Sequence, residues 1–121
     1  PKQESAVSSL NKLDNDEFLQ KITQIIEENL EMEKMDIAFI ADKMCMSHST
    51  LYRKIKGLTD MSANEFIRKV KMRKGVELLM SGQYTISEIA YMIGFSSVAY
   101  FRQCFKDEYG MSPSDYVKQK Q

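Results

Sequence analysis

One helical pattern occurs twice in this sequence, and the two copies lie about fifty residues apart. When Ile40-Ala41 is aligned with Ile89-Ala90, the positions that would pack or cap a helix coincide. The coinciding pairs are Met44 with Ile93, Ser47 with Ser96, Tyr52 with Phe101 and Arg53 with Arg102 and, after one inserted residue in the second copy, Lys56 with Lys106 and Met61-Ser62 with Met111-Ser112. The outward positions differ, since His48-Ser49-Thr50 stands where the second copy has Ser97-Val98-Ala99. The repeat therefore predicts one helical unit that is built twice, with shared packing and a different surface.

Signals for the starts and ends of helices recur along the whole chain. Side chains that can cap a helix N-terminus precede the apolar runs, namely Asp14, Asp36, Ser47, Ser62, Thr85, Ser96 or Ser97, and Ser112. Glutamates three residues after Asp14, Ser62 and Thr85 give the spacing of a capping box. Gly57, Gly82 and Gly110 fit the position just after a helix end. No segment alternates with period two for long enough to predict a strand, so the fold class is all-α, with about seven helices.

These signals predict two helix-turn-helix subdomains joined by a long linker helix, all within residues 14–118. The expected order is a linker or disordered end at 1–13, a first helix to about Asn29, a helix-turn-helix at about 36–57, the linker helix at about 63–80, a second helix-turn-helix at about 85–110 and a final helix at 113–118. The linker helix would be about 27 Å long at 1.5 Å per residue. Gly75 lies inside it, and we expect a closely packed neighbouring helix to be the reason that glycine is tolerated there.

The charges of this chain are segregated, although the net charge is zero. Residues 1–36 hold 4 basic and 9 acidic side chains, a net −5, and the first helix therefore has an acidic outer face. Residues 53–74 hold 8 basic and 2 acidic side chains, a net +6. Separation of this kind creates a local field even when the total vanishes. The basic region is either a solvated helix face or a surface that attracts a polyanion.

Little in the sequence points to catalysis or metal binding. The single histidine, His48, has no identifiable partner, and there is no phosphate-cradling glycine-rich loop, so we do not expect an enzyme. One histidine and two distant cysteines give no metal-ligand spacing, and no cofactor or metal is expected. Cys45 and Cys104 are expected to be buried thiols in a reducing cytosol, and a disulfide or a reactive thiol is the alternative. No apolar run approaches the roughly 20 residues of a membrane span.

The second copy of the repeat carries a resemblance to a known family. It reads ISEIAYMIGFSSVAYFRQCFKDEYGMSPSDY, with Ile-Ala, Gly-Phe, Tyr-Phe, Phe-Lys and Gly-x-Ser-Pro-x-x-Tyr in that order. In these residues the chain resembles the AraC/XylS family of bacterial transcription regulators. The first copy, with SHSTLYRKIK and MSANEFIR, is most similar to the C-terminal output domains of Bacteroides-type hybrid two-component regulators. The chain departs from the family pattern at Cys45, where glycine is frequent in the turn, and at Gly75, where alanine is usual.

The resemblance implies a domain that places two recognition helices in successive major grooves on one face of double-stranded DNA. Base readout is then expected from the outward, N-terminal part of each recognition helix: His48, Ser49, Thr50, Tyr52 and Arg53 in the first copy, and Ser97, Val98, Ala99, Arg102 and Gln103 in the second. Phosphate contacts are expected from lysines and helix-capping hydroxyls: Ser47, Lys54, Lys56, Ser62, Thr85, Ser96, Lys106 and Ser112. For each base-reading candidate, a phosphate contact or a solvated side chain is the alternative. Leu51, Ile55, Phe101, Cys104 and Phe105 are expected in the core, and Tyr100 is ambiguous.

The expected function is that of a sequence-specific DNA-binding transcription regulator domain, and the alternative is a helical protein-interaction module that does not bind DNA. The outward positions of the repeat favour DNA, because they are mostly Ser, His, Arg, Gln and Lys, not apolar residues. If Pro1 begins a fragment, the sensor lies upstream and this domain is the output end. Expected partners are double-stranded DNA, a second copy of the protein through upstream domains, and RNA polymerase; no small-molecule ligand is expected in this fragment. The expected location is the cytoplasm, at the nucleoid or at the cytoplasmic end of a membrane-bound sensor.

Overall fold

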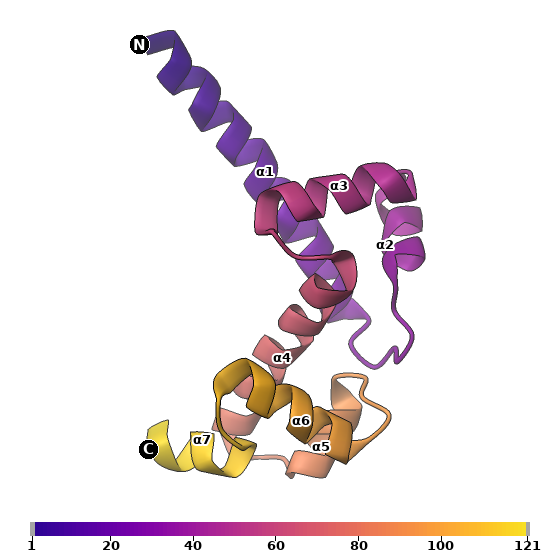
Figure 1. Cartoon of the computed structure of the whole chain (residues 1–121), viewed down its shortest axis with the longest axis vertical. Coiled ribbons are helices and arrows are strands. Elements are labelled where there is room, and N and C mark those ends of the chain that lie inside the picture. Colours follow the sequence, from indigo (N-terminus) through magenta and orange to yellow (C-terminus); the bar gives the residue numbers. More distant parts are fainter. Residues whose placement is uncertain (1, 121) are drawn as a thin grey trace. The chain divides into compact units, whose positions relative to one another are not determined.

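The computed structural model describes the backbone of residues 2–120 and the side chains of residues 14–120. This part of the chain holds seven helices and no strand, so the predicted all-α class is confirmed. Figure 1 shows the helices in order: α1 Lys2–Glu28, α2 Ile37–Met44, α3 His48–Thr59, α4 Ala63–Ser81, α5 Ile86–Met92, α6 Val98–Tyr109 and α7 Pro113–Lys120. None of the described helices is long and apolar enough to cross a membrane.

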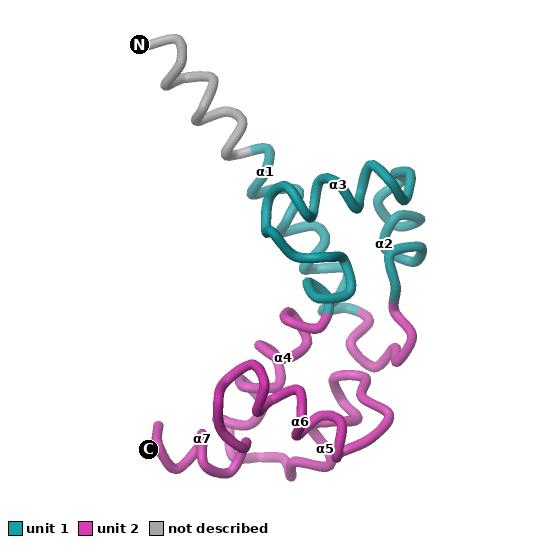
Figure 2. Tube along the Cα trace, viewed as in Figure 1, with its two compact units in different colours: residues 1–28, 36–67 teal, residues 29–35, 68–121 magenta. Residues whose placement is uncertain are grey.

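The chain divides into two compact units, coloured separately in Figure 2. Unit 1 consists of Pro1–Glu28 and Asp36–Ile67, and unit 2 of Asn29–Met35 and Arg68–Gln121. Unit 1 therefore contains the first copy of the repeat, α2 and α3, and unit 2 contains the second copy, α5 and α6. The linker helix α4 begins in unit 1 and ends in unit 2.

In unit 1, α2 contacts both α1 and α3. The side chains of Asp36 and Ser47 cap α2 and α3 as predicted, accepting hydrogen bonds from the Phe39 N–H (3.0 Å) and the Thr50 N–H (3.2 Å). Buried apolar residues come from all four helices of the unit: Phe18, Ile22 and Ile26 from α1, Ile40 and Ala41 from α2, Leu51 and Ile55 from α3, and Ala63, Phe66 and Ile67 from α4. The first copy is thus a helix-turn-helix that α1 packs against.

Unit 2 is built on a cluster of buried apolar side chains from α4, α5, the α5–α6 turn and α6: Met72, Leu79, Ile89, Ala90, Ile93, Phe95, Phe101, Cys104 and Phe105. The Phe105 ring lies 5.5 Å, centroid to centroid, from Tyr116 of α7, so the short last helix closes one side of this core. The packing prediction for Gly75 is confirmed, because a methyl group there would lie 3.1 Å from Ile93 Cδ1 and 3.6 Å from Phe101 Cε1.

The two copies share the geometry of the turn between their helices. Cys45 adopts a left-handed φ of 55°, and the aligned Gly94 has a φ of 85°. In the first turn the Met46 N–H donates to Ala41 O at 3.0 Å; in the second, the Phe95 N–H donates to Ala90 O at 2.9 Å. Cysteine in place of glycine therefore does not change the backbone of the first turn. Because it stands at the helix end, the Cys45 side chain is exposed, and the prediction that it is buried was wrong; Cys104 is buried as predicted.

Several helix ends differ from those expected. Helix α1 begins at Lys2, so Asp14 lies inside it and is not its N-cap; residues 2–13 contain no Gly or Pro to interrupt a helix. Helix α3 continues through Gly57 to Thr59 and ends at Asp60, which takes the left-handed conformation with a φ of 60°. The side chains of residues 1–13 lie outside the described part, and the linker expected there stays a prediction.

Candidate nucleic-acid interface

The outward face of α3 carries all five base-reading candidates of the first copy. His48, Ser49, Thr50, Tyr52 and Arg53 are exposed, whereas Leu51 and Ile55 between and after them are buried. One helix face therefore packs in unit 1 and the opposite face meets solvent. The Arg53 side chain makes one long hydrogen bond, from Nε to Ser49 O at 3.4 Å, which leaves most of its guanidinium donors available.

Some of the base-reading candidates on α6 are exposed to solvent, and others cap the helix or pack against the core. Ala99, Arg102 and Gln103 are exposed. Ser97 is half-buried and caps the helix, because its Oγ accepts the Tyr100 N–H at 3.2 Å. Val98 is half-buried and packs against the core of unit 2. The exposed part of the predicted set therefore starts at Ala99.

The exposed polar side chains on α6 differ in whether they make hydrogen bonds within the protein. Gln103 Nε2 donates to Asp107 Oδ1 at 2.9 Å, one turn further along the helix. Arg102 has no hydrogen-bond or ion-pair partner among the residues that the structure describes. A guanidinium that is exposed and unpaired can donate two parallel hydrogen bonds to a guanine edge without first breaking an internal contact.

Tyr100 is a surface residue that the predicted set left undecided. It is 52% exposed, and its ring centroid lies 5.5 Å from that of Phe95 in the turn. It stands three residues before Gln103 on α6, so the two share a helix face. This helical spacing is the sequence signal that could have added Tyr100 to the candidates.

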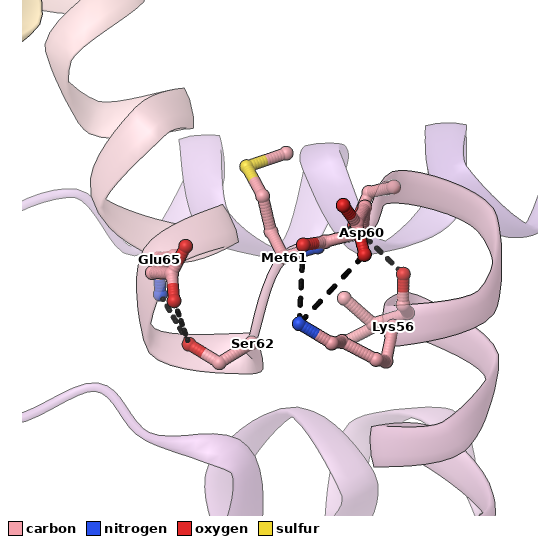
Figure 3. Close-up of polar contacts among 7 residues, drawn as sticks. Lys56, Asp60, Met61, Ser62 and Glu65 are labelled. Carbon is pink, nitrogen blue, oxygen red and sulfur yellow. Dashed lines mark hydrogen bonds and ion pairs between the residues drawn. The ribbon is translucent and has the colours of Figure 1, made fainter.

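Capping hydroxyls mark the N-termini of four helices, as expected. Ser47, Ser62, Thr85 and Ser112 each accept a hydrogen bond from the backbone N–H three residues later, at 3.1–3.2 Å. Thr85 and Glu88 complete a reciprocal capping box. The Ser62 hydroxyl, besides accepting from the Glu65 N–H, donates a hydrogen bond to Glu65 Oε1 at 3.2 Å (Figure 3). Ser96 is exposed but is not the cap of α6, a role that the next serine takes. Ser97 therefore corresponds to Ser47, and the buried Phe101 to the buried Leu51, so the predicted pairing of Ser47 with Ser96 and of Tyr52 with Phe101 was wrong.

The three lysines expected at phosphates are not equivalent. Lys54 Nζ lies 4.4 Å from the centroid of the Phe18 ring and so takes part in packing α3 against α1. Lys56 donates to Asp60 O at 3.2 Å and lies 3.9 Å from Asp60 Oδ1, as Figure 3 shows. An exposed pair of this kind is worth about 0–1 kcal/mol, so it can open at little cost. Lys106 is exposed and has no partner in the described part of the chain.

Internal partners occupy several of the basic side chains of α4. Lys69 Nζ lies 2.9 Å from Glu108 Oε1 of α6, and Lys74 Nζ lies 3.0 Å from Glu77 Oε2. Lys71 is buried, and removal from water lowers the pKa of its ammonium, while the Glu33 carboxylate opposes that shift. Arg68 is exposed, and none of the described residues pairs with it. The positive charge counted from the sequence is therefore only partly available to an external anion.

The chain matches proteins of known class. Residues 40–119 match the model of a family described as helix-turn-helix domain. Histidine kinase P4 of Formosa agariphila is 33% identical over 113 residues, which make up 93% of this chain and 8% of the kinase. The HTH-type transcriptional regulator AdiY of Escherichia coli is 35% identical over 98 residues, which make up 81% of this chain and 38% of that protein. This chain thus spans well under half the length of both relatives.

A solved structure has the same fold. The DNA-binding domain of AdpA, a global transcriptional factor, was determined in complex with a target DNA. It superposes on this chain with a TM-score of 0.72 and 25% identity, over 84% of this chain and 90% of that one.

Proposed function

Because this chain belongs to the AraC-type helix-turn-helix family of DNA-binding transcription regulators, we propose that it reads a specific sequence in two successive major grooves of double-stranded DNA. Helices α3 and α6 are its recognition helices. The observation that carries this proposal is the repeat itself: two helix-turn-helix units share their turn hydrogen bonds and present different side chains on the exposed faces of their second helices. Two units of one fold with two surfaces suit the reading of two different groups of base pairs.

Base readout follows from the donors and acceptors on these helices. Arg53 and Arg102 can each donate two hydrogen bonds to guanine O6 and N7, and Gln103 can pair with adenine once it leaves Asp107. The methyl of Ala99 can contact the thymine methyl. His48, Ser49, Thr50 and Tyr52 offer further polar contacts in the first groove, and Ser97 and Val98 reach only the edge of the second because each is half-buried.

Phosphate contacts fix the register of the domain on the duplex. Lys106, which is exposed, and Lys56, whose pair with Asp60 is exposed, are the lysines available for phosphates. The capped N-termini of α3, α4, α5 and α7 supply backbone N–H groups. Lys54, which lies over the Phe18 ring, contributes less than its position in the sequence suggests. The first copy is expected to supply more of the nonspecific affinity; equal losses of salt slope on neutralising Lys56 or Lys106 would argue against that.

The domain is the output end of a longer signalling protein. Its similarity to the histidine kinase covers 93% of this chain but only 8% of the kinase, which leaves room for sensing and kinase domains in such a protein. Regulation then consists of bringing two copies together on adjacent DNA sites, in the cytoplasm at the nucleoid, with RNA polymerase as the downstream partner. The family is one of DNA-binding regulators and not a class of enzymes.

Selection of bound duplexes from random DNA, followed by fluorescence-anisotropy titrations, tests the proposal. The selected duplex should bind far more tightly than a scrambled one, and affinity should fall steeply with salt, since released counterions drive the binding. Absence of salt-dependent binding at low salt would reject DNA binding and favour the protein-interaction module. A binding footprint no longer than one helical turn, about 10 base pairs, would reject the two-groove geometry.

A further inference from the structure

The loop between α1 and α2 belongs to a different unit from the helices that it joins. Residues 29–35, here called the strap, are part of unit 2, whereas α1 and α2 are both in unit 1. Figure 2 shows the strap in the colour of unit 2 between two segments of unit 1. The chain therefore connects the two units at both ends of the strap as well as within α4, between Ile67 and Arg68.

Lys71 of α4 holds the strap. The residue is 5% exposed, and its Nζ donates a hydrogen bond of 2.8 Å to the carbonyl oxygen of Met32, 39 positions earlier in the chain. Burying an ammonium group is costly unless a polar partner replaces the water that it loses. The strap carbonyl is such a partner, and the carboxylate of Glu33 in the strap adds a favourable charge interaction. The strap thus supplies polar partners that the buried Lys71 ammonium needs.

Gly94, in the turn between α5 and α6, has no side chain, and this allows the strap backbone to pack closely against the turn. A methyl group on Gly94 Cα would clash with Leu30 O, and it would lie 2.8 Å from Lys71 Nζ and 3.1 Å from Met32 O. The turn itself does not demand glycine, because Cys45 adopts the same left-handed conformation at the aligned position of the first copy. Close approach of the strap, rather than backbone conformation alone, is what excludes a side chain at Gly94.

We propose that Lys71 and Gly94 are positioning residues for DNA recognition: they fasten the strap to unit 2, and the strap restrains unit 1 through both of its ends. The inference rests on the proposed function in that it assumes one recognition helix in each unit. Two linked binding modules gain affinity through the effective concentration of the second at its site. The strap is a second link between unit 1 and unit 2, in addition to α4. A second link raises the effective concentration of one recognition helix at its half-site once the other is bound. It also narrows the range of half-site spacings that both recognition helices can reach together.

Three variants of the 121-residue chain release the strap in different ways. Lys71→Met removes the ammonium at similar volume, Gly94→Ala places a methyl against Leu30 O, and insertion of Gly-Ser after Glu33 lengthens the strap and leaves both residues intact. The matched controls are Lys69→Met, an exposed lysine on the same helix, and Gly82→Ala. Gly82 also has a positive φ, 70°, but nothing lies within 4 Å of an added methyl. Circular dichroism and thermal melting confirm that each variant is folded at the assay temperature.

The DNA measurement compares the selected full site with sites in which one half is scrambled and with sites that carry one extra base pair between the halves. In the parent chain we expect the full site to bind on the order of 10²-fold more tightly than either half-site. In each strap variant, the ratio of full-site to half-site affinity should fall by at least about threefold, and the site with the extra base pair should be disfavoured less than in the parent. The half-site affinities themselves should stay within about twofold of the parent values. Both controls should match the parent.

Two results would overturn the inference. One is a full-site advantage and a spacing preference that are unchanged in all three variants. The other is a fall in the half-site affinity of unit 2 that accounts for the whole loss, since Lys71 and Gly94 would then merely support the fold of that unit. Hydrogen exchange of residues 29–35 in the free domain adds a readout without DNA: Lys71→Met should raise their exchange and Lys69→Met should not. If this difference is seen and the parent chain binds no DNA, the proposed function fails while the fastening of the strap stands.

Discussion

Arg102 is the side chain whose removal we expect to cost the most sequence specificity, because it is exposed and unpaired within the described part of α6. Arg102→Ala should weaken binding to the selected site by about 1–3 kcal/mol, the usual worth of a bidentate base contact. Arg102→Lys keeps the charge but loses the planar fork, so it should show most of the same loss. Anisotropy titrations on selected and scrambled duplexes measure both. Lys106→Ala is the comparison, and it should weaken the two duplexes alike; equal losses for Arg102→Ala on both would reassign Arg102 to a phosphate.

The burial of Lys71 links stability to pH. Its pKa is lowered from 10.5 mainly by removal from water, so the folded chain loses this proton at a lower pH than the unfolded chain does. Between the lowered pKa and 10.5 the unfolded state binds more protons, and the free energy of unfolding should rise with pH across that window. Urea denaturation of the parent and of Lys71→Met at several pH values measures the difference. A parallel pH dependence in the two proteins would show that Lys71 does not carry the effect.

At the level of the helix, the two adjacent serines before α6 make a direct test of capping. Ser97 Oγ accepts the Tyr100 N–H at 3.2 Å, and Ser96 has no such role. Ser97→Ala should lower the free energy of unfolding by about 1 kcal/mol, the typical cost of losing an N-cap. Ser96→Ala should change it by less than about 0.5 kcal/mol, as is usual for exposed positions. Chemical denaturation compares them, and a larger loss for Ser96→Ala than for Ser97→Ala would mean that Ser96 is the N-cap of α6.

Two glycines within helices should respond in opposite ways to alanine. Gly57 of α3 has open space around it, so Gly57→Ala should stabilise the domain by roughly 0.5–1 kcal/mol through the helix preference of alanine. An alanine Cβ at Gly75 of α4 would lie 3.1 Å from Ile93 Cδ1, and Ile93 is fully buried. Overpacking costs of about 1–3 kcal/mol exceed the gain in helix preference, so Gly75→Ala should destabilise. Thermal melting of both variants decides this; a raised melting temperature for Gly75→Ala would show that the core can yield.

The sequence predicts the helices and their N-terminal caps better than it predicts the contacts between residues far apart in the chain. Capping patterns act over three or four residues, which is why Asp36, Ser47, Ser62, Thr85 and Ser112 were identified correctly. Helix ends were missed where a local signal was weak: Gly57 is compatible with a helix, and two adjacent serines could both cap α6. The burial of Lys71 depends on a carbonyl 39 residues away, and no local pattern reports such a contact. The base-reading residues themselves stay predictions.

For the whole molecule, fewer basic side chains are free to contact DNA than the composition suggests, and this limits the DNA affinity of a single domain. Of the basic side chains on α4, Lys71 is buried and Lys69 and Lys74 have acidic partners. The net charge of the chain is also zero, so long-range attraction to DNA is weak compared with that of a basic protein. A single domain should therefore have modest affinity, which supports the proposal that joining two copies controls its binding to DNA.

Fusing the chain to a dimerising coiled coil tests this idea. On a duplex with two selected sites, the enforced dimer should bind about 10²–10⁴-fold more tightly than the free domain, through the effective concentration of the second copy. On a duplex with one selected site, the two proteins should differ by little more than the statistical factor of about two. Anisotropy at fixed salt compares them, and a coiled coil carrying an Arg102→Lys domain controls for nonspecific binding by the dimer. If the dimer gains nothing on paired sites while both proteins bind a single site, bringing two copies together is not how this domain is regulated.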